Sequence, residues 1–255
     1  MELPLPPEEM RALVGPTDTA AFDNPNRALV YRDLAGVTGD VFDFGCGCGR
    51  LARQLIQQRP QPRSYVGVDL HAGMVRWCQT NLAPLAPQFR FEHHDIFNAG
   101  FNPHGKPSHT DLPVDDASFD LVIAHSVFTH IVEDSAMHYL NECARILRPG
   151  GVLASTWFLF DKREFAMMQN FQNALYINLI DPTNAVIFDR KWLEEACLKV
   201  GFEAQNIEAP ALRGFHWMLQ LRREDNPKPL DLPIDEAPLG SKPPPVPSAD
   251  PSSIG

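Results

Sequence analysis

An acidic residue and three alternating glycines stand where an apolar segment, residues 41–44, gives way to a helical pattern over residues 51–56. Glycine lacks a Cβ atom, so such a turn can bend sharply and lie flat against a ligand. The N-terminal end of the helix carries partial positive charge and would face the same crevice. The pattern indicates a site for a small polar cofactor; the alternative is a tight strand-to-helix turn without a ligand. The residues concerned are Asp43, Gly45, Gly47 and Gly49.

The spacing of the glycines separates two classes of cofactor. A dinucleotide-binding turn follows the pattern G-x-G-x-x-G, in which the third position is small because the helix packs closely on the strand there. Arg50 occupies that position, which argues against a dinucleotide. A nicotinamide-dependent oxidoreductase would share the sheet and a ribose-binding acid, and it is kept as an alternative function.

A second acid stands where ribose binding needs one. Residues 64–68 form a short β-rich run that ends in Asp69, 20 residues after Gly49. One helix and the next parallel strand require about that separation. A carboxylate there can accept hydrogen bonds from both ribose hydroxyls. The other interpretation of Asp69 is an N-cap for a helix that starts near Ala72.

Further strands follow at regular intervals. Residues 89–92 are expected to form the third strand and residues 116–124 the fourth strand with its preceding turn. A helix over 135–147 ends in the turn 148–151, because proline stops a helix and glycine supplies the turn. The fifth strand is then expected over 152–158.

These motifs resemble the class I S-adenosylmethionine-dependent methyltransferases. The resemblance covers residues 28–222 and rests on the D-x-G-x-G-x-G turn, Asp69, Asp95 and the L-R-P-G-G-V-L string that starts at Leu147. It implies that the glycine turn packs under the methionine part of S-adenosylmethionine and that Asp69 binds the ribose. It also implies that Asp95 accepts from the adenine amino group, with Ile96 against the ring. The expected cofactor contacts are Asp43, Gly45, Cys46, Gly47, Gly49, Arg50, Asp69, Leu70, Met74, Asp95, Ile96, His125 and Ser126.

The expected fold is α/β and Rossmann-like, with a seven-stranded, mostly parallel sheet and helices on both faces. A helix over 190–202 and strands over 203–208 and 214–222 would complete the sheet with an antiparallel hairpin. The predicted domain organisation is an N-terminal helical cap segment (1–39, with a helix over 20–34), a methyltransferase domain (40–223) and a proline-rich disordered tail (224–255).

Two insertions interrupt the predicted domain, at residues 97–113 and 160–188. The resemblance implies that these helical or loop insertions, together with the N-terminal region to Gly39, form the acceptor pocket and its lid. The phenylalanines and methionines of 160–188 have two alternative interpretations, ordinary helix packing and a homodimer face.

Composition limits the class of protein. The chain has 255 residues, 44% of them apolar, which is enough for one large core, and no apolar run is long enough to span a bilayer. The N-terminus lacks the features of a signal peptide, so we expect a cytoplasmic protein with its five cysteines reduced. A formal net charge of -10 argues against a nucleic-acid acceptor and favours a small molecule, sugar or glycolipid.

A hydroxyl acceptor must lose its proton, and histidine is the side chain best suited to remove it at neutral pH. His130 is the first candidate base because it follows the fourth strand by one short loop, and His125 is the second. The alternative for His130 is a packed or helix-capping role. No metal is expected. The alternative is a divalent metal bound by scattered loop residues, namely His93, His94, His104, His109 and Asp111. A protein that binds the cofactor without catalysis is the remaining alternative.

Overall fold

The computed structural model describes residues 3–15, 17–107, 109–168, 172–178 and 180–238. Its helices are α1 Glu8–Leu13, α2 Arg50–Gln57, α3 Ala72–Asn81, α4 Glu133–Ile146 and α5 Arg190–Val200. Its strands are β1 Asp40–Phe44, β2 Ser64–Asp69, β3 Phe89–His93, β4 Phe119–Ala124, β5 Leu147–Phe160, β6 Ala174–Tyr176, β7 Val186–Asp189, β8 Phe202–Glu208 and β9 Trp217–Arg223. Within the described residues, no helix is both long enough and apolar enough to cross a membrane.

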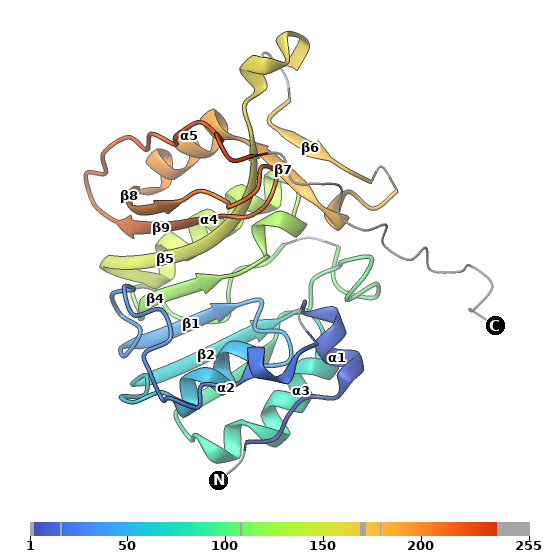
Figure 1. The fold of residues 1–255 in the computed structure, drawn as a ribbon, viewed down its shortest axis with the longest axis vertical. Helices are drawn as coiled ribbons and strands as arrows, with labels where there is room; N and C mark the ends of the chain where they lie inside the picture. The colour runs from blue at the N-terminus through green and yellow to red at the C-terminus, as the bar shows by residue number, and fades with distance from the viewer. Residues whose placement is uncertain (1–2, 16, 108, 169–171, 179, 239–255) are drawn as a thin grey trace, which may run out of the picture.

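The central sheet has the order β3-β2-β1-β4-β5-β9-β8 (Figure 1). The first five strands are parallel, and β9 runs antiparallel to both β5 and β8. This arrangement confirms the expected Rossmann-like sheet and its antiparallel hairpin. In such a sheet the carboxyl ends of the parallel strands share one edge, where ligands bind.

The sheet has nine strands rather than seven because β5 is long. Its pairing with β9 ends where Trp157 meets Trp217, and β5 continues to Phe160. The backbone of its last three residues pairs with β7 instead, and β6 joins β7 antiparallel. Both extra strands come from the insertion 160–188, so this insertion is tied to the sheet by backbone hydrogen bonds.

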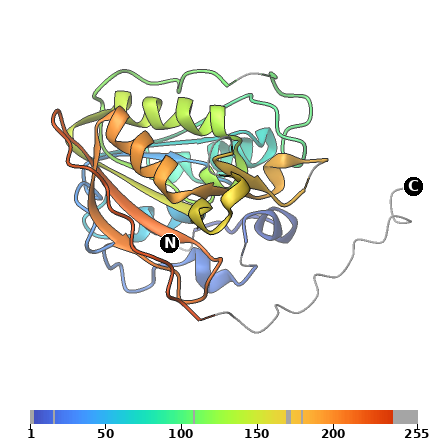
Figure 2. The same ribbon diagram turned by 90° about the horizontal axis from the view of Figure 1, so that it is seen from above.

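Helices cover both faces of the sheet (Figure 2). Successive β1 residues point to opposite faces, so Phe42 belongs to the apolar cluster under α4 and α5, whereas Val41 belongs to the cluster under α2 and α3. Both side chains are fully buried. Burial on both faces explains why the central strands β1 and β4 are mostly apolar.

One predicted helix is wrong. Residues 20–34 form no α-helix: a 3-10 turn, Thr19–Phe22, is followed by turns in which Arg27 and Tyr31 have φ angles of 54° and 56°. Pro25 also disfavours helical geometry in the residue before it. The insertion 160–188, expected to be helical or a loop, contains short 3-10 turns and two short strands. Phe171 and Leu179 of its apolar stretch lie outside the described residues.

The first part of the predicted disordered tail packs on the domain. Leu230 and Leu232 are buried, the Leu232 N–H donates to Glu194 at 2.8 Å, and Arg190 donates to the Leu232 carbonyl. The prediction of disorder is therefore wrong for residues 224–238, and residues 239–255 lie outside the described residues.

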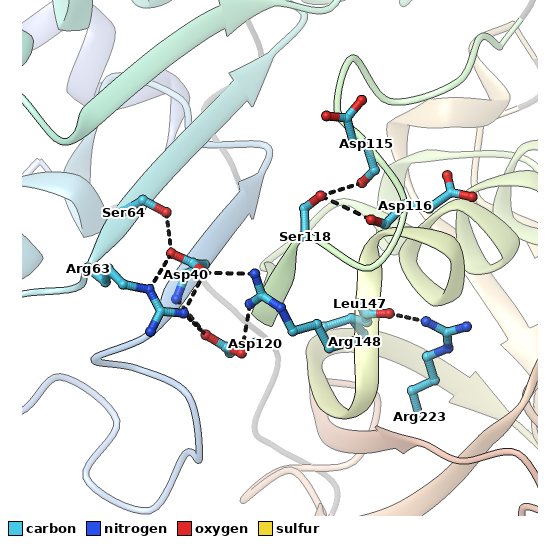
Figure 3. A network of polar contacts seen from close by, with 10 residues as sticks. All are labelled: Asp40, Arg63, Ser64, Asp115, Asp116, Ser118, Asp120, Leu147, Arg148 and Arg223. Carbon is cyan, nitrogen blue, oxygen red and sulfur yellow. Dashed lines mark hydrogen bonds and ion pairs between the residues drawn. The ribbon is translucent and has the colours of Figure 1, made fainter.

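Ion pairs clamp the edge of the sheet opposite the carboxyl ends (Figure 3). Arg148 reaches Asp40 at 2.9 Å and Asp120 at 2.8 Å, and Arg63 contacts the same two carboxylates. The hydrogen bond from Arg63 holds the pKa of Asp40 well below its usual value, despite the opposing effect of burial. This network joins β1, β2, β4 and β5 at their N-terminal ends and leaves the other edge open.

Candidate functional site

A cavity of about 600 Å³ lies at the carboxyl ends of β1, β2 and β4. Its volume is within the range of roughly 300–1,000 Å³ that is typical of small-molecule sites. The glycine turn forms one wall, and both insertions and the loop after β4 contribute others. Predicted site residues in the lining are Asp43, Gly45, Cys46, Gly47, Arg50, Asp69, Leu70, Met74, Ile96, His125, Ser126 and His130.

The turn after β1 requires glycine. Gly45, Gly47 and Gly49 have φ angles of 83°, 53° and 80°. A Cβ atom at Gly45 would lie 2.6 Å from Val127, and one at Gly47 would lie 2.7 Å from Val14. Gly45 and Gly47 thus keep the backbone open to the cavity.

Gly49 and Asp95 are not in the lining. Gly49 is the N-cap residue of α2, where an added Cβ would lie 2.6 Å from Leu82, so its visible role is close packing beneath the turn. Asp95 accepts a hydrogen bond from Asn102 at 3.0 Å and so fastens the insertion 97–113.

Asp69 is held by two backbone N–H groups. Its Oδ2 accepts from Gly47 and its Oδ1 from His71, both at 2.8 Å. The N-cap of α3 is His71, whose ring nitrogen accepts from the Met74 N–H, so Asp69 does not cap this helix. Burial raises the pKa of Asp69 above its ordinary value, and the two backbone hydrogen bonds oppose that rise. The carboxylate is therefore fixed in place at the cavity wall.

Asp43 lies deeper than Asp69. Only 3% of its surface is exposed, and the Tyr65 hydroxyl donates to its Oδ2 at 2.6 Å. Burial raises the pKa of Asp43 to about 7, the hydrogen bond from Tyr65 and the charge of Arg50 lower it, and the charge of Asp69 raises it. The cavity thus holds an acid that changes charge near neutral pH.

The two candidate bases have different surroundings. His125 lies 3.0 Å from the Tyr31 hydroxyl through Nδ1, and burial lowers its pKa to about 4. His130 is half-buried, and its Nδ1 lies 3.1 Å from the Thr183 carbonyl oxygen. A carbonyl only accepts hydrogen bonds, so Nδ1 carries the proton and Nε2 of neutral His130 is unprotonated. His130 is therefore equipped to accept a proton.

The N-terminal segment 1–39, expected to form a cap, supplies one wall of the cavity through residues that the sequence did not single out. Val14 and Gly15 from the segment after α1 and Tyr31 line it, although they are remote in sequence from the glycine turn. Arg53 of α2 holds this region: its buried guanidinium donates to the carbonyls of Leu3 at 2.8 Å and Pro4 at 3.0 Å. The only sequence signal was an arginine in a helix, which ordinarily indicates a solvent-exposed position.

The end of the cavity formed by the insertions is largely apolar or aromatic. Within the described residues, no group of three or more His, Cys, Asp and Glu side chains could hold a metal ion there or elsewhere. His94 instead shares a 2.8 Å hydrogen bond with the Tyr139 hydroxyl. Contributors to this end are Phe97, Phe101, Pro107, Ile131, Val132, Tyr139 and Pro182.

Comparisons with known proteins agree with this geometry. Residues 41–151 match a family described as "Methyltransferase domain". A phthiotriol/phenolphthiotriol dimycocerosates methyltransferase of Mycobacterium leprae is 32% identical over 143 residues, which cover 52% of this chain and 45% of the relative. A malonyl-[acyl-carrier protein] O-methyltransferase of Hahella chejuensis is 29% identical over 132 residues, covering 52% and 41%. The matches span less than half the length of these relatives.

Solved structures show the same fold. An S-adenosylmethionine-dependent methyltransferase from Mesorhizobium loti has a TM-score of 0.52 at 16% identity, with 74% of this chain and 94% of that chain covered. A putative sarcosine dimethylglycine methyltransferase from Galdieria sulphuraria has the same TM-score at 15% identity, with 74% and 79% covered.

Proposed function

We propose that this chain is a class I S-adenosylmethionine-dependent methyltransferase that methylates a hydroxyl group of a small-molecule, sugar or glycolipid acceptor. The match of residues 41–151 to a methyltransferase domain supports this proposal. The observation that carries the proposal is a single cavity lined by both the glycine turn and His130. The cofactor and a base for the acceptor can therefore share one enclosed space.

The cofactor of this family is S-adenosylmethionine, and the residues present fit it. Gly45 and Gly47 place their backbone in the cavity lining, and Asp69 offers a fixed carboxylate to the ribose hydroxyls. Arg50 offers positive charge to the carboxylate of the methionine part, and Asp43 offers negative charge to its cationic groups. When bound, the cofactor supplies an electrophilic methyl group, whose bond to sulfur breaks as its bond to the acceptor oxygen forms.

His130 is the proposed general base. Its unprotonated Nε2 can accept the proton of the acceptor hydroxyl, which leaves an imidazolium on the protein. His125 is the weaker candidate because its pKa of about 4 makes it a poor proton acceptor at neutral pH. The cavity walls exclude water from the reacting atoms and align the acceptor, which are the main tasks left to the protein.

The apolar end of the cavity supports an acceptor with an apolar part. Phe97, Phe101 and Ile131 offer carbon surface rather than charge. The name of one relative, a phthiotriol/phenolphthiotriol dimycocerosates methyltransferase, supports an acceptor of this kind. A net charge of -10 weighs against a polyanionic acceptor.

The test combines calorimetric titration with S-adenosylhomocysteine and a search for methyl transfer from radiolabelled S-adenosylmethionine to hydroxylated lipids and glycosides. We expect binding, transfer to at least one apolar hydroxyl compound, and loss of transfer in His130→Gln with product binding retained. Absence of binding would overturn the cofactor site. Binding without transfer to any acceptor would favour the non-catalytic alternative, and a fluorescence titration with NADH tests the oxidoreductase.

A further inference from the structure

We infer that Thr183 is a positioning residue for His130: it keeps the Nδ1–H tautomer in place and thereby keeps Nε2 free toward the cavity. The inference rests on the proposed function only for the role of Nε2 as the atom that accepts the proton of the acceptor hydroxyl. The tautomer itself is a property of the protein alone and can be measured without an acceptor.

The contact between the two residues joins segments far apart in the chain. His130 ends a short 3-10 turn after β4, Phe128–His130, whereas Thr183 lies in the 3-10 turn Pro182–Asn184 of the second insertion. The Thr183 carbonyl oxygen lies 3.1 Å from His130 Nδ1, and both residues line the cavity. Either nitrogen of a neutral imidazole can carry the proton, and the partner of one nitrogen decides the state of the other.

Asp181 holds the backbone of Thr183 from one side. Its Oδ1 accepts from the Thr183 N–H at 3.1 Å and from the Thr183 hydroxyl at 2.6 Å. Its carbonyl accepts from the Asn184 N–H at 3.0 Å. These three bonds close the turn around Thr183, so they set the direction in which its carbonyl points.

Asn98 holds the Thr183 side chain from the other side. Its Nδ2 donates to the Thr183 hydroxyl oxygen at 3.1 Å, and its Oδ1 accepts from the N–H groups of Gly100 and Phe101. Asn98 is only 6% exposed. If the contact were lost, its buried polar atoms would have no hydrogen-bond partner, which is energetically costly. The hydroxyl of Thr183 therefore links the first insertion to the second.

The consequence is a three-residue clasp, Asn98–Thr183–Asp181, that links the contact between the two insertions to the tautomer of His130. When the clasp is intact, His130 is held in the proton-accepting tautomer. Burial, and after it the charge of His130, lowers the pKa of His216, which precedes β9. No hydrogen bond joins the two rings in the described residues.

The test is a long-range ¹H–¹⁵N correlation spectrum of protein labelled with ¹⁵N-histidine, recorded at pH 8, with the His130 signals assigned by their loss in His130→Gln. We expect the wild-type protein to show His130 as the Nδ1–H tautomer. Thr183→Val keeps the shape of the side chain but removes both hydroxyl contacts, so we expect a mixture of tautomers. Thr183→Ser keeps the hydroxyl and should restore the single tautomer.

Asp181→Asn is the second variant, and His216→Gln is the matched control on a residue outside the clasp. We expect a shift toward mixed tautomers in the first and an unchanged spectrum of His130 in the control. An Nε2–H tautomer in the wild-type protein, or an unchanged tautomer in Thr183→Val, would overturn the inference. Neither result depends on whether S-adenosylhomocysteine binds, so failure of the proposed function is seen separately in the titration.

Once an acceptor is found, the clasp also has a kinetic signature. General base catalysis contributes about 10²–10⁴-fold, so a partly populated tautomer in Thr183→Val should lower kcat by roughly three- to tenfold. KM for the acceptor should change less than kcat, and Thr183→Ser should recover most of the loss. A change in KM alone would indicate a merely structural role for Thr183.

Discussion

Asp43 and Asp69 are both acids near strand ends, yet the structure gives them different tasks. Asp69 receives two backbone N–H groups and stands at the cavity wall, whereas Asp43 is buried beneath the hydroxyl of Tyr65. Asp69 is therefore suited to direct hydrogen bonds with a ligand, and Asp43 to a longer-range electrostatic effect on it. The two roles predict different responses to mutation and to pH.

Asp69→Ala should weaken S-adenosylhomocysteine binding by roughly 10- to 100-fold. The estimate follows from about 1.5–3 kcal/mol for hydrogen bonds to a charged group. Isothermal titration calorimetry measures the change. Asp115→Ala, which removes an exposed carboxylate from the loop before β4, is the matched control and should bind as the wild-type protein does. Undiminished affinity in Asp69→Ala would contradict the ribose assignment.

Cofactor binding should tighten as the pH rises from 6 to 8. The pKa of Asp43 is raised from 3.8 to about 7 by burial, so below pH 7 the carboxyl is largely protonated and gives the cationic ligand no negative charge. Other groups that face it are Tyr31, Tyr65, Arg50, Cys46 and Asp69. Calorimetry with S-adenosylmethionine in buffers of different ionisation enthalpy should detect proton release near pH 6.5, and Asp43→Asn should abolish it.

The raised pKa of Asp43 also determines how the stability of the folded protein changes with pH. Because the pKa of Asp43 is higher in the folded than in the unfolded chain, its contribution to stability is greatest below pH 4 and is lost as the pH rises from about 4 to 7. Asp43→Asn should therefore unfold at a higher temperature than the wild-type protein at pH 8. A lower unfolding temperature at that pH would count against the raised pKa.

At the scale of elements, α2 does more than follow the glycine turn. Arg53, on the buried face of α2, binds the N-terminal segment. It donates hydrogen bonds to the carbonyls of Leu3, Pro4 and Phe22 and forms an ion pair with Asp23. That segment carries Val14 over Gly47. The helix thus positions both the floor of the cofactor site and its cover.

Arg53→Met should destabilise the protein by roughly 2–4 kcal/mol, because the buried carbonyl groups that it now satisfies lose their partner. Urea unfolding measures the change, and limited proteolysis should cut first within residues 3–15. Arg76→Met, on an exposed position of α3, is the control and should lie within about 0.5 kcal/mol of the wild-type protein. Equal stability of both variants would refute the anchoring role.

Elements with local signals could be predicted from sequence. Helix α5 begins after Asp189, whose side chain accepts from the Trp192 N–H, and ends at Gly201, which has a φ angle of 95°. Aspartate is a favoured N-cap residue and glycine a favoured C-cap residue, so both helix ends can be predicted from residue type. Strands β6 and β7 could not be predicted, because they form only where β5 extends beyond β9. The apolar pattern of residues 20–34 predicts a helix, but Pro25 disfavours helical geometry in the residue before it, and the segment forms turns.

At the scale of the whole molecule, residues 224–238 act as a strap across α5. Leu232→Ala should lower the free energy of unfolding by about 2–4 kcal/mol, because it removes buried apolar atoms and leaves a cavity. Thermal and urea unfolding test this. Ile234→Ala, at a side chain that is 63% exposed, is the control and should change stability by less than about 0.5 kcal/mol. Equal effects of the two substitutions would argue that the strap does not pack in solution.

The sequence by itself determined the parallel sheet, the glycine turn and the acid at the end of β2, because each depends on residue types at short spacing: glycine for a positive φ angle, apolar runs for buried strands and a carboxylate for a strand end. Tertiary structure alone decided which remote residues meet at the cavity. Val14, Tyr31, Asn98 and Thr183 reach it through loops whose paths depend on partners distant in sequence. A contact across many residues leaves no local pattern, so the Thr183 carbonyl oxygen beside His130 Nδ1 could be found only in the folded chain.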